Sequence, residues 1–357
     1  MTNFLRETAI RVLTTILILL FGFHIVDLTQ FIALFSGIYL LPMLYLLYNL
    51  IQSKEWSIQN FTISSVTKRL KGRMISFALF VFAGQFFNLL ARTNDTFMIV
   101  GLKGLSDASI FAIATYVSAI LEIPQRSLTS ISIPILAKSW KEKDFENIKH
   151  IYHKSVSNLL AIGLLLFGLI WLNIQNLVSF LNWVSHKQGG GYDALVNLAF
   201  ILGLAKLIDL ATGVNAQIIG TSNFWKFDFI TNVMFVIISI PLNYYLIQHY
   251  DLTGLAISNL IAYTIYNSVR FGFLYFKFKL QPYRWKHGLF LLLSIGLMLI
   301  VHQIPAPENF VANIAIQSIV YGTGFYLLTI WINPAPEILN YFKEFVSKQY
   351  NRLFKKG

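Results

Sequence analysis

Three pairs of oppositely charged residues lie inside stretches of sequence that are otherwise apolar. They are Arg92 with Asp95, Glu122 with Arg126, and Lys206 with Asp209. Spacings of three or four residues place both members of a pair on one face of a helix. Charged groups in a bilayer cost about 2.5–3.5 kcal/mol each on insertion scales, so they usually face a partner or a cavity. One pair could simply neutralise itself, but three pairs in one chain favour a polar internal cavity.

The position of each charged residue within its apolar stretch indicates how deep in the membrane it should lie. Lys206 and Asp209 lie nearest the middle of the membrane by count from the ends of their stretch, and Arg126 lies toward the cytoplasm. Depth therefore favours Lys206 and Arg126 as the cations in the cavity. Arg270 has no charged neighbour at helical spacing, and we expect its side chain to snorkel to the interface.

Prolines lie in the same regions as the charges. Pro124 and Pro134 should interrupt the helix that carries Glu122, and Pro241 should kink a later one. Broken helices near buried charges are common in transporters, although proline is also frequent in passive membrane helices.

The elements that must position these residues are ten apolar stretches separated by short loops. They span residues 8–24, 30–51, 74–101, 107–136, 155–175, 194–219, 227–248, 252–276, 286–303 and 311–332. Each approaches or exceeds the ~20 residues that cross a hydrocarbon core, and a lipid-exposed backbone must satisfy its own hydrogen bonds. The sequence therefore predicts an all-α, polytopic membrane helix bundle of about ten transmembrane helices.

The positive charge falls on alternate loops and predicts the orientation. The two ends of the chain and the loops at 52–73, 137–154, 220–226 and 277–286 carry 22 of the 28 lysines and arginines. Because basic loops stay in the cytoplasm, both termini should be cytoplasmic. The tail has apolar residues near one helical face with basic residues between them, which favours a helix on the membrane surface.

Composition agrees with a membrane protein and excludes several classes. The chain is 56% hydrophobic and 12% charged, with a mean hydropathy of +0.61. The net charge of +12 follows from the basic loops, so nucleic acid is not an expected partner. Without cysteine, disulfides and thiolate metal sites are excluded.

We find no P-loop, no zinc-protease motif and no nucleophile elbow, and we expect no enzyme, cofactor or metal. His150 and His153 should be solvated.

A series of short motifs resembles one family of membrane transporters. In order they are Asn-Asp-Thr-Phe-Met-Ile-Val-Gly (94–101), Ile-Phe-Ala-Ile-Ala-Thr-Tyr (110–116), Glu-Ile-Pro-Gln-Arg (122–126), Ser-Ile-Pro-Ile-Leu-Ala (132–137), Gly-Val-Asn-Ala-Gln-Ile-Ile-Gly-Thr-Ser (213–222), Pro-Leu-Asn-Tyr-Tyr-Leu-Ile (241–247) and Leu-Thr-Gly-Leu-Ala-Ile-Ser (252–258). Their order and spacing resemble the polysaccharide transporter family of lipid-linked oligosaccharide (O-antigen-type) flippases. That family belongs to the superfamily of multidrug, oligosaccharidyl-lipid and polysaccharide exporters.

The resemblance implies two six-helix lobes, usually followed by two further helices. It assigns 1–52 to the last two helices of a truncated first lobe, 53–73 to a cytoplasmic linker and 74–279 to the complete second lobe. Residues 280–333 would be the two appended helices, and 334–357 a basic amphipathic cytoplasmic tail. Four helices of the family pattern would then precede Met1, as expected of a truncated gene, a mis-assigned start or a remnant.

The resemblance also implies a function, namely alternating-access transport of a polyprenyl-diphosphate glycan across the bacterial cytoplasmic (inner) membrane for surface polysaccharide such as lipopolysaccharide. The expected phosphate and glycan contacts are Arg126, Lys206 and Arg92. Glu122, Asp209 and Asp95 would hold these cations or carry a coupling proton or cation. Membrane lipids and other polysaccharide-assembly proteins are the further partners expected.

Three competing functions stay open. One is a multidrug extruder of the same superfamily, against which a cationic cavity argues. Another is an integral-membrane polysaccharide polymerase or ligase, although these carry a large outer loop and no outer loop here exceeds about twenty residues. The third is an inactive fragment that serves as a scaffold for glycan assembly.

Overall fold

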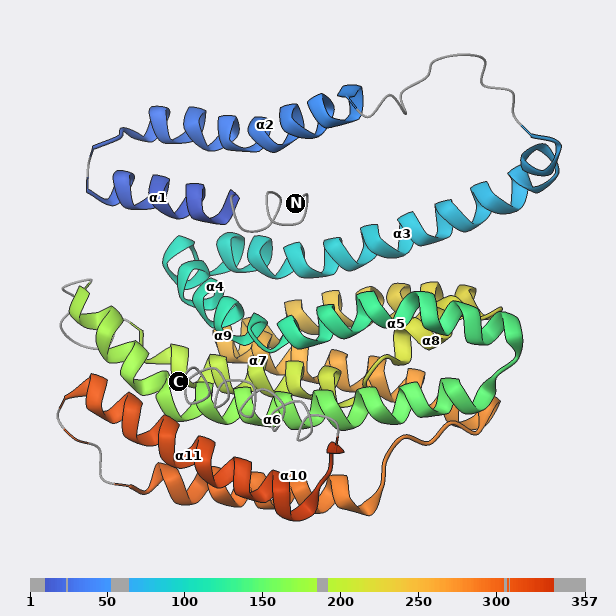
Figure 1. Cartoon of the computed structure of the whole chain (residues 1–357). Coiled ribbons are helices and arrows are strands. Elements are labelled where there is room, and N and C mark those ends of the chain that lie inside the picture. Colours follow the sequence, from blue (N-terminus) through green and yellow to red (C-terminus); the bar gives the residue numbers. More distant parts are fainter. Residues whose placement is uncertain are drawn as a thin grey trace, which may run out of the picture. The chain divides into compact units, whose positions relative to one another are not determined.

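The computed structural model describes residues 10–23, 25–52, 64–184, 192–304, 307 and 309–336. All the regular secondary structure in these ranges is helical (Figure 1). The internal contacts divide the chain into two compact units, Met1–Arg73 and Met74–Gly357, and each is described separately.

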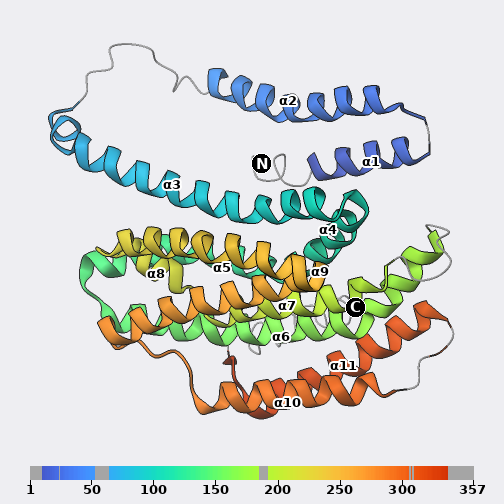
Figure 2. The ribbon, with the colours of Figure 1, turned by 180° about the vertical axis from the view of Figure 1, so that it is seen from behind.

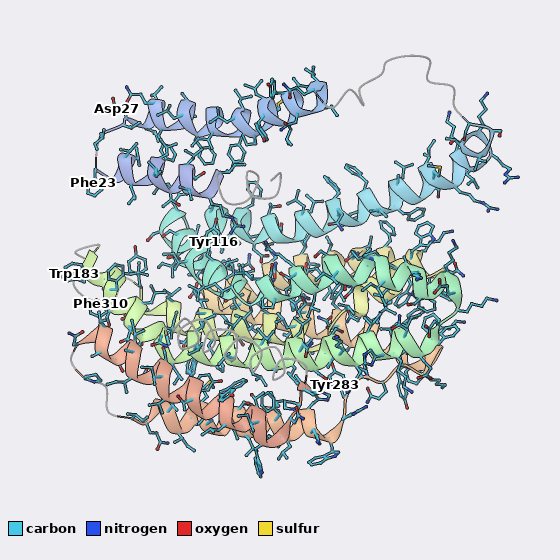
Figure 3. The ribbon with its side chains drawn as sticks, in the orientation of Figure 1. Phe23, Asp27, Tyr116, Trp183, Tyr283 and Phe310 are labelled. Carbon is cyan, nitrogen blue, oxygen red and sulfur yellow. The ribbon has the colours of Figure 1, made fainter. Side chains whose placement is uncertain are left out.

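The first unit contains a helical hairpin. Helices α1 (Ile10–Gly22) and α2 (Leu28–Gln52) pack against each other, with the rings of Phe21 and Phe31 5.0 Å apart. Phe23 and Asp27 mark the turn between them in Figure 3. The start of α3 (Ser65–Leu102) also belongs to this unit, because the Oγ of Ser64 accepts the backbone N–H of Thr67 and begins the helix there. The basic part of the expected linker, residues 65–73, is therefore helical.

The second unit continues from the rest of α3 into eight further helices, seen from behind in Figure 2. They are α4 (Leu105–Ala119), α5 (Glu122–Glu142), α6 (Phe145–Val184), α7 (Ala194–Ala211), α8 (Asn215–Thr221), α9 (Trp225–Phe278), α10 (Trp285–His302) and α11 (Phe310–Ile332). Helix α7 packs on α4, α6 and α9 and so lies in the interior of this unit, whereas α10 and α11 pack on each other and on α6.

Helix α9 consists of two antiparallel halves. Its 54 residues would extend about 80 Å as a single rod, far beyond a hydrocarbon core of roughly 30 Å. The backbone leaves helical geometry at Tyr250 and Asp251, which has φ +53°. Side-chain bonds then connect residues that lie a similar number of positions before and after this turn. They link Arg270 to Asp228, Tyr266 to Asn232, and both Asn243 and Asn259 to Asp95 of α3.

Seven helices in the described residues are long and apolar enough to cross a membrane, or eight if the bent pair α4 and α5 forms one span. The bend of 50° falls at residues 120–121, and Pro124 lies in the first turn of α5 just after it. Pro134 lies within α5 and Pro241 within α9, whose break falls at residues 250–251 instead. The chain is therefore an all-helical protein whose apolar helices suit a membrane bundle.

The expected sixth span is divided in two. Helix α7 ends at Ala211, and α8 starts at Asn215 after a turn at Gly213, which has φ +66°. A Cβ on this glycine would lie 2.6 Å from the Oγ of Ser155 on α6. Because both the dihedral angle and the space exclude a side chain, only glycine fits this break.

One end of the second unit gathers the basic connections, and we call it the basic end. It comprises the α5–α6, α8–α9 and α9–α10 connections. The indole of Trp140 stacks edge-on against Phe145 and tilts against Phe278, with ring centroids 5.6 and 5.0 Å apart. The Nδ1 of His153 bonds the carbonyl of Pro282 at 2.6 Å.

The opposite end carries the remaining turns. Lys103, after α3, forms an ion pair with Asp251 at the turn of α9. Figure 3 shows Trp183 and Phe310 at this end. Tyr283 lies in the α9–α10 connection, and Tyr116 lies on an exposed face of α4. Residues 337–357 of the tail, where a surface helix is expected, lie outside the described residues.

Candidate functional site

Four of the six charged residues expected in a polar cavity line the same cavity of about 160 Å³, which we call the inner cavity. They are Asp95 of α3, Glu122 and Arg126 of α5, and Lys206 of α7. Asn259 and Tyr263 of α9 complete its polar wall. The side chain of Arg92 lies outside the described part of the structure. Residues from four helices that are distant in sequence therefore meet in the interior of the second unit.

Glu122 connects two cations across this cavity. One carboxylate oxygen accepts from Arg126 at 2.9 Å, in the i,i+4 pair that the spacing indicated. The other oxygen pairs with the Nζ of Lys206 at 2.5 Å. The Glu122 and Lys206 side chains are 8% and 15% exposed, whereas that of Arg126 is 65% exposed. A buried carboxylate thus holds one enclosed ammonium and one guanidinium that stays accessible.

Lys206 has a second contact that fixes its head group. Its Nζ donates to the phenol oxygen of Tyr263 at 2.9 Å and lies 4.6 Å from the centre of that ring. Lys206 therefore bridges α5 and α9 rather than following the i,i+3 spacing toward Asp209.

Asp95 is held by amides. The Nδ2 of Asn243 and that of Asn259 each donate to one of its carboxylate oxygens, at 2.6 and 3.0 Å. The Oδ1 of Asn243 is buried without a hydrogen-bond partner among the described residues. The carboxylate consequently receives two neutral donors from the two halves of α9.

A larger polar cavity of about 500 Å³ adjoins the inner one and shares Phe235 and Tyr263 as walls. We call it the outer cavity, and Asp209 lines it. The carboxylate of Asp209 accepts from the amides of Gln125 at 3.1 Å and Asn267 at 2.9 Å. The sixth expected residue therefore lies in a neighbouring cavity of the same polar region.

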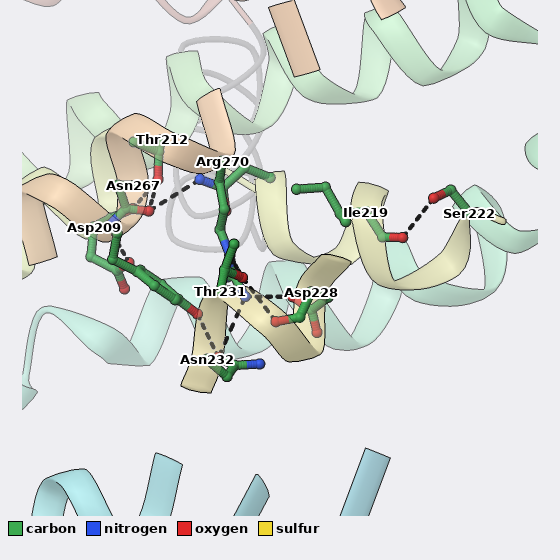
Figure 4. Close-up of polar contacts among 11 residues, drawn as sticks. Asp209, Thr212, Ile219, Ser222, Asp228, Thr231, Asn232, Asn267 and Arg270 are labelled. Carbon is green, nitrogen blue, oxygen red and sulfur yellow. Dashed lines mark hydrogen bonds and ion pairs between the residues drawn. The ribbon is translucent and has the colours of Figure 1, made fainter. Parts of the chain in front are cut away.

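Asn267 joins this carboxylate to the break between α7 and α8. Its Oδ1 accepts from the hydroxyl of Thr212 at 2.9 Å (Figure 4). The same oxygen accepts from the amide of Asn215 at 3.1 Å. Thr212 lies just after the end of α7, and Asn215 begins α8. These two bonds tie the side chains on either side of the break to α9.

Arg270 corrects the expectation of a snorkelling side chain. It is 2% exposed, pairs with Asp228 and donates from Nε to the hydroxyl of Thr231 at 3.0 Å. Its guanidinium also lies 4.0 Å from the ring centre of Tyr266. The prediction was wrong because Asp228 is 42 residues away in sequence and meets Arg270 only through the α9 hairpin.

The expectation of a cationic cavity is also modified. Among the described lining residues, the inner cavity has two acids, Asp95 and Glu122, and two cations, Arg126 and Lys206. The outer cavity has Asp209 and Asp228 against Arg270. The described side chains therefore form a balanced to slightly acidic polar region.

Sequence reasoning missed the neutral partners. Asn243, Asn259 and Asn267 hold the two acids that have amide partners, yet a count of charges does not detect them. The signal that could have found them is the recurrence of amides within apolar stretches, where an unpaired polar group is costly. In the described ranges no three or more His, Cys, Asp or Glu residues cluster as metal ligands.

Comparison of the chain with family models, with curated proteins and with solved structures found no match.

Proposed function

We propose that this protein is a membrane transporter that moves a lipid-linked oligosaccharide, a polyprenyl-diphosphate glycan, across the bacterial cytoplasmic membrane. The observation that carries the proposal is the Glu122–Lys206–Arg126 cluster in a cavity between apolar helices. Charged groups at such depth are expensive and mark substrate or ion pathways in membrane proteins. The proposal also rests on the resemblance of the ordered motifs to oligosaccharide flippases.

Arg126 is the residue best suited to a diphosphate. Glu122 orients one edge of its guanidinium, while most of the side chain stays accessible at 65% exposure. A guanidinium binds phosphate oxygens through paired N–H groups and keeps its charge at any relevant pH. Lys206 is more enclosed and also donates a hydrogen bond to Tyr263. It would bind phosphate after its ion pair with Glu122 breaks. Arg92 would be a third cation.

The acids with amide partners suit the coupling of transport to an ion. Asp95 and Asp209 are each held by two neutral amides, and neither has a described cation in direct contact. A carboxylate in this setting can accept a proton or bind a small cation without breaking an ion pair. Loading and release of that ion would favour different states of an alternating-access cycle.

The proposed architecture has ten transmembrane helices. The two halves of α9 and the bent pair α4–α5 count as three spans, and the short α1 counts as one. Residues 74–279 would form the six-helix second lobe, 280–333 the two appended helices and 1–52 part of the first lobe. The basic end would face the cytoplasm, with both termini on that side. Other proteins of polysaccharide assembly would be its partners.

Transport by the purified full chain tests this proposal. Proteoliposomes would be loaded with a fluorescent polyprenyl-diphosphate oligosaccharide, and its appearance in the outer leaflet measured by quenching. We expect Arg126→Gln and Lys206→Gln to reduce the rate at least tenfold. The matched control is Lys138→Gln, which removes one exposed charge from the same helix as Arg126. No transport by the wild-type chain, or unchanged transport by both cavity variants, would overturn the proposal.

A multidrug extruder is the second candidate, and the charge balance of the two cavities is the observation that favours it. Asp95 and Asp209 lie in cavities whose described charges are not cationic, so a cationic organic molecule could be accommodated. Efflux of ethidium from the same proteoliposomes distinguishes the candidates. Ethidium transport that requires Asp95 and does not require Arg126 would favour the extruder.

A further inference from the structure

A third cavity lies at the basic end, away from the candidate site. Its volume is about 510 Å³, and residues of α6, the start of α10 and the segment after α11 line it. Its cationic lining residues are Lys154, Arg284 and Lys286, and three histidines accompany them, His150, His153 and His287. Within the described part of the chain, its lining includes no Asp or Glu. The volume falls within the range of pockets that hold small molecules.

One face of α6 supplies a large part of this lining. The five residues His150, His153, Lys154, Ser157 and Asn158 follow the i, i+3, i+4, i+7, i+8 spacing of a single helical stripe. The expectation of solvated histidines was wrong for His153, which is half-buried and bonded to the carbonyl of Pro282 at 2.6 Å.

Hydrogen bonds hold the wall of this cavity in one arrangement. The backbone N–H of Arg284 donates to Nδ1 of His287 at 2.9 Å. The Nε2 of His287 can therefore carry the proton, and it lies 2.9 Å from the Oγ of Ser157. Ser157 in turn donates to the carbonyl of His153 at 2.8 Å. This series of hydrogen bonds leaves His287 neutral and ties the start of α10 to α6.

His153 lines the cavity with one ring nitrogen already bonded. A carbonyl can only accept, so Nδ1 of His153 carries a proton in its bond with Pro282. Its Nε2 is the second hydrogen-bonding atom of this cavity-lining ring.

The position of the cavity indicates where its ligand comes from. Trp285 lines the cavity and is 74% exposed, between the exposed Arg284 and Lys286. Tryptophan and basic residues at the end of a membrane helix mark the level of the lipid head groups. Trp285 also begins α10, whose N-terminal dipole favours negative charge. Basic pockets between transmembrane helices bind the phosphates of anionic lipids.

We propose that this cavity binds the phosphate head group of an anionic membrane lipid. The chemistry required is a phosphate between Arg284, Lys286 and the histidine-bearing face of α6. A soluble phosphate compound shares that chemistry, but the exposed tryptophan at the rim favours a ligand that stays in the bilayer. This proposal does not depend on the transport function.

Lipid binding to the full chain in dodecyl maltoside micelles tests it. Native mass spectrometry would measure affinity for cardiolipin and for zwitterionic phosphatidylethanolamine. Each basic residue near an anionic lipid surface contributes about fivefold to binding. We therefore expect R284Q/K286Q to weaken cardiolipin binding about twenty- to thirtyfold, with little change for phosphatidylethanolamine.

The control is K138Q/K141Q, which removes the same charge from exposed positions near the basic end but outside the cavity. It should change cardiolipin affinity less than twofold. The charge-preserving R284K/K286R should bind as the wild type does, which separates loss of charge from loss of fold. Equal weakening in both glutamine variants would overturn the proposal, because binding would then follow surface charge. A second result would also overturn the proposal. If inorganic phosphate at millimolar concentration occupied the cavity and no lipid bound selectively, the ligand would be a soluble phosphate compound and not a membrane lipid.

Discussion

The Lys206–Glu122 pair allows a quantitative test that does not depend on any assigned function. With 15% and 8% exposure, these side chains form a buried pair, whereas the Arg126–Glu122 pair has an exposed partner. Removing one member of a buried pair typically costs about 3–5 kcal/mol, because the other charge stays buried. An exposed pair contributes roughly 0–1 kcal/mol. We therefore expect Glu122→Gln to lower the free energy of unfolding by about 3 kcal/mol and Arg126→Gln by under ~1 kcal/mol.

The double variant decides whether the pair is the cause. Lys206→Met alone should cost about 3 kcal/mol, since it leaves the Glu122 carboxylate buried beside only one exposed cation. In the E122Q/K206M variant neither charge remains, and replacing a buried ion pair by neutral groups is often nearly neutral. The expected loss is about 1 kcal/mol, so the coupling energy should exceed roughly 2 kcal/mol.

Reversible unfolding in mixed micelles measures these values. The full chain in dodecyl maltoside would be titrated with sodium dodecyl sulfate and its helix content followed by circular dichroism. Arg126→Gln serves as the control for loss of charge near the same carboxylate. If the losses of the two single variants simply add in the double variant, with coupling below about 0.5 kcal/mol, the geometry derived for the inner cavity is refuted.

Three other perturbations have expected outcomes. Gly254→Ala should lower the free energy of unfolding by about 2 kcal/mol or more, because its Cβ would lie 2.0 Å from the carbonyl oxygen of Leu246. Its control is Gly296→Ala, whose Cβ would have nothing within 4 Å. This variant should change the free energy of unfolding by under ~1 kcal/mol in the same titration. Arg270→Lys should cost about 1–3 kcal/mol, since a lysine keeps the charge but loses the fork of donors; a loss as small as that of Gly296→Ala would contradict the buried network. Tyr283 lies outside the spans, and burial raises its pKa from 10.0 to about 12. The folded state therefore favours the neutral phenol, so stability should hold below pH 10 and fall between about pH 10 and 12. In a pH series of thermal unfolding, Tyr283→Phe should remove the part of this fall that Tyr283 causes. An unchanged pH profile of this variant would refute the assignment.

The sequence predicted the helical class well because apolar length is a local property. Helices α2, α9, α10 and α11 begin and end within a few residues of the expected stretches, whereas α6 (Phe145–Val184) extends well beyond 155–175 at both ends. Two of the differences have identifiable structural causes. The cap at Ser64 lengthens α3, and the packing of Gly213 on α6 divides the expected sixth span. Both depend on contacts that hydropathy does not describe.

The site was only partly predictable because its contacts are mostly non-local. The Glu122–Arg126 pair follows from spacing, since both residues lie on one helix. Lys206 meets Glu122 across 84 residues, and Arg270 meets Asp228 across 42. No local rule selects such partners. Charge counting identified residues that must be neutralised, but only the packing of α5, α7 and α9 identifies what neutralises them.

The antiparallel α9 also bears on how the chain enters the bilayer during synthesis. Its two halves are adjacent in sequence and joined by a two-residue turn, so their mutual contacts have a low sequence separation and can form early. Asp228 is made first and Arg270 follows on the returning half. If the two halves insert into a bilayer together as a hairpin, the two residues would enter it as a neutral pair and not as two separate charges, each of which would cost about 2.5–3.5 kcal/mol. The hairpin would thereby make a buried arginine compatible with insertion before the surrounding helices have assembled.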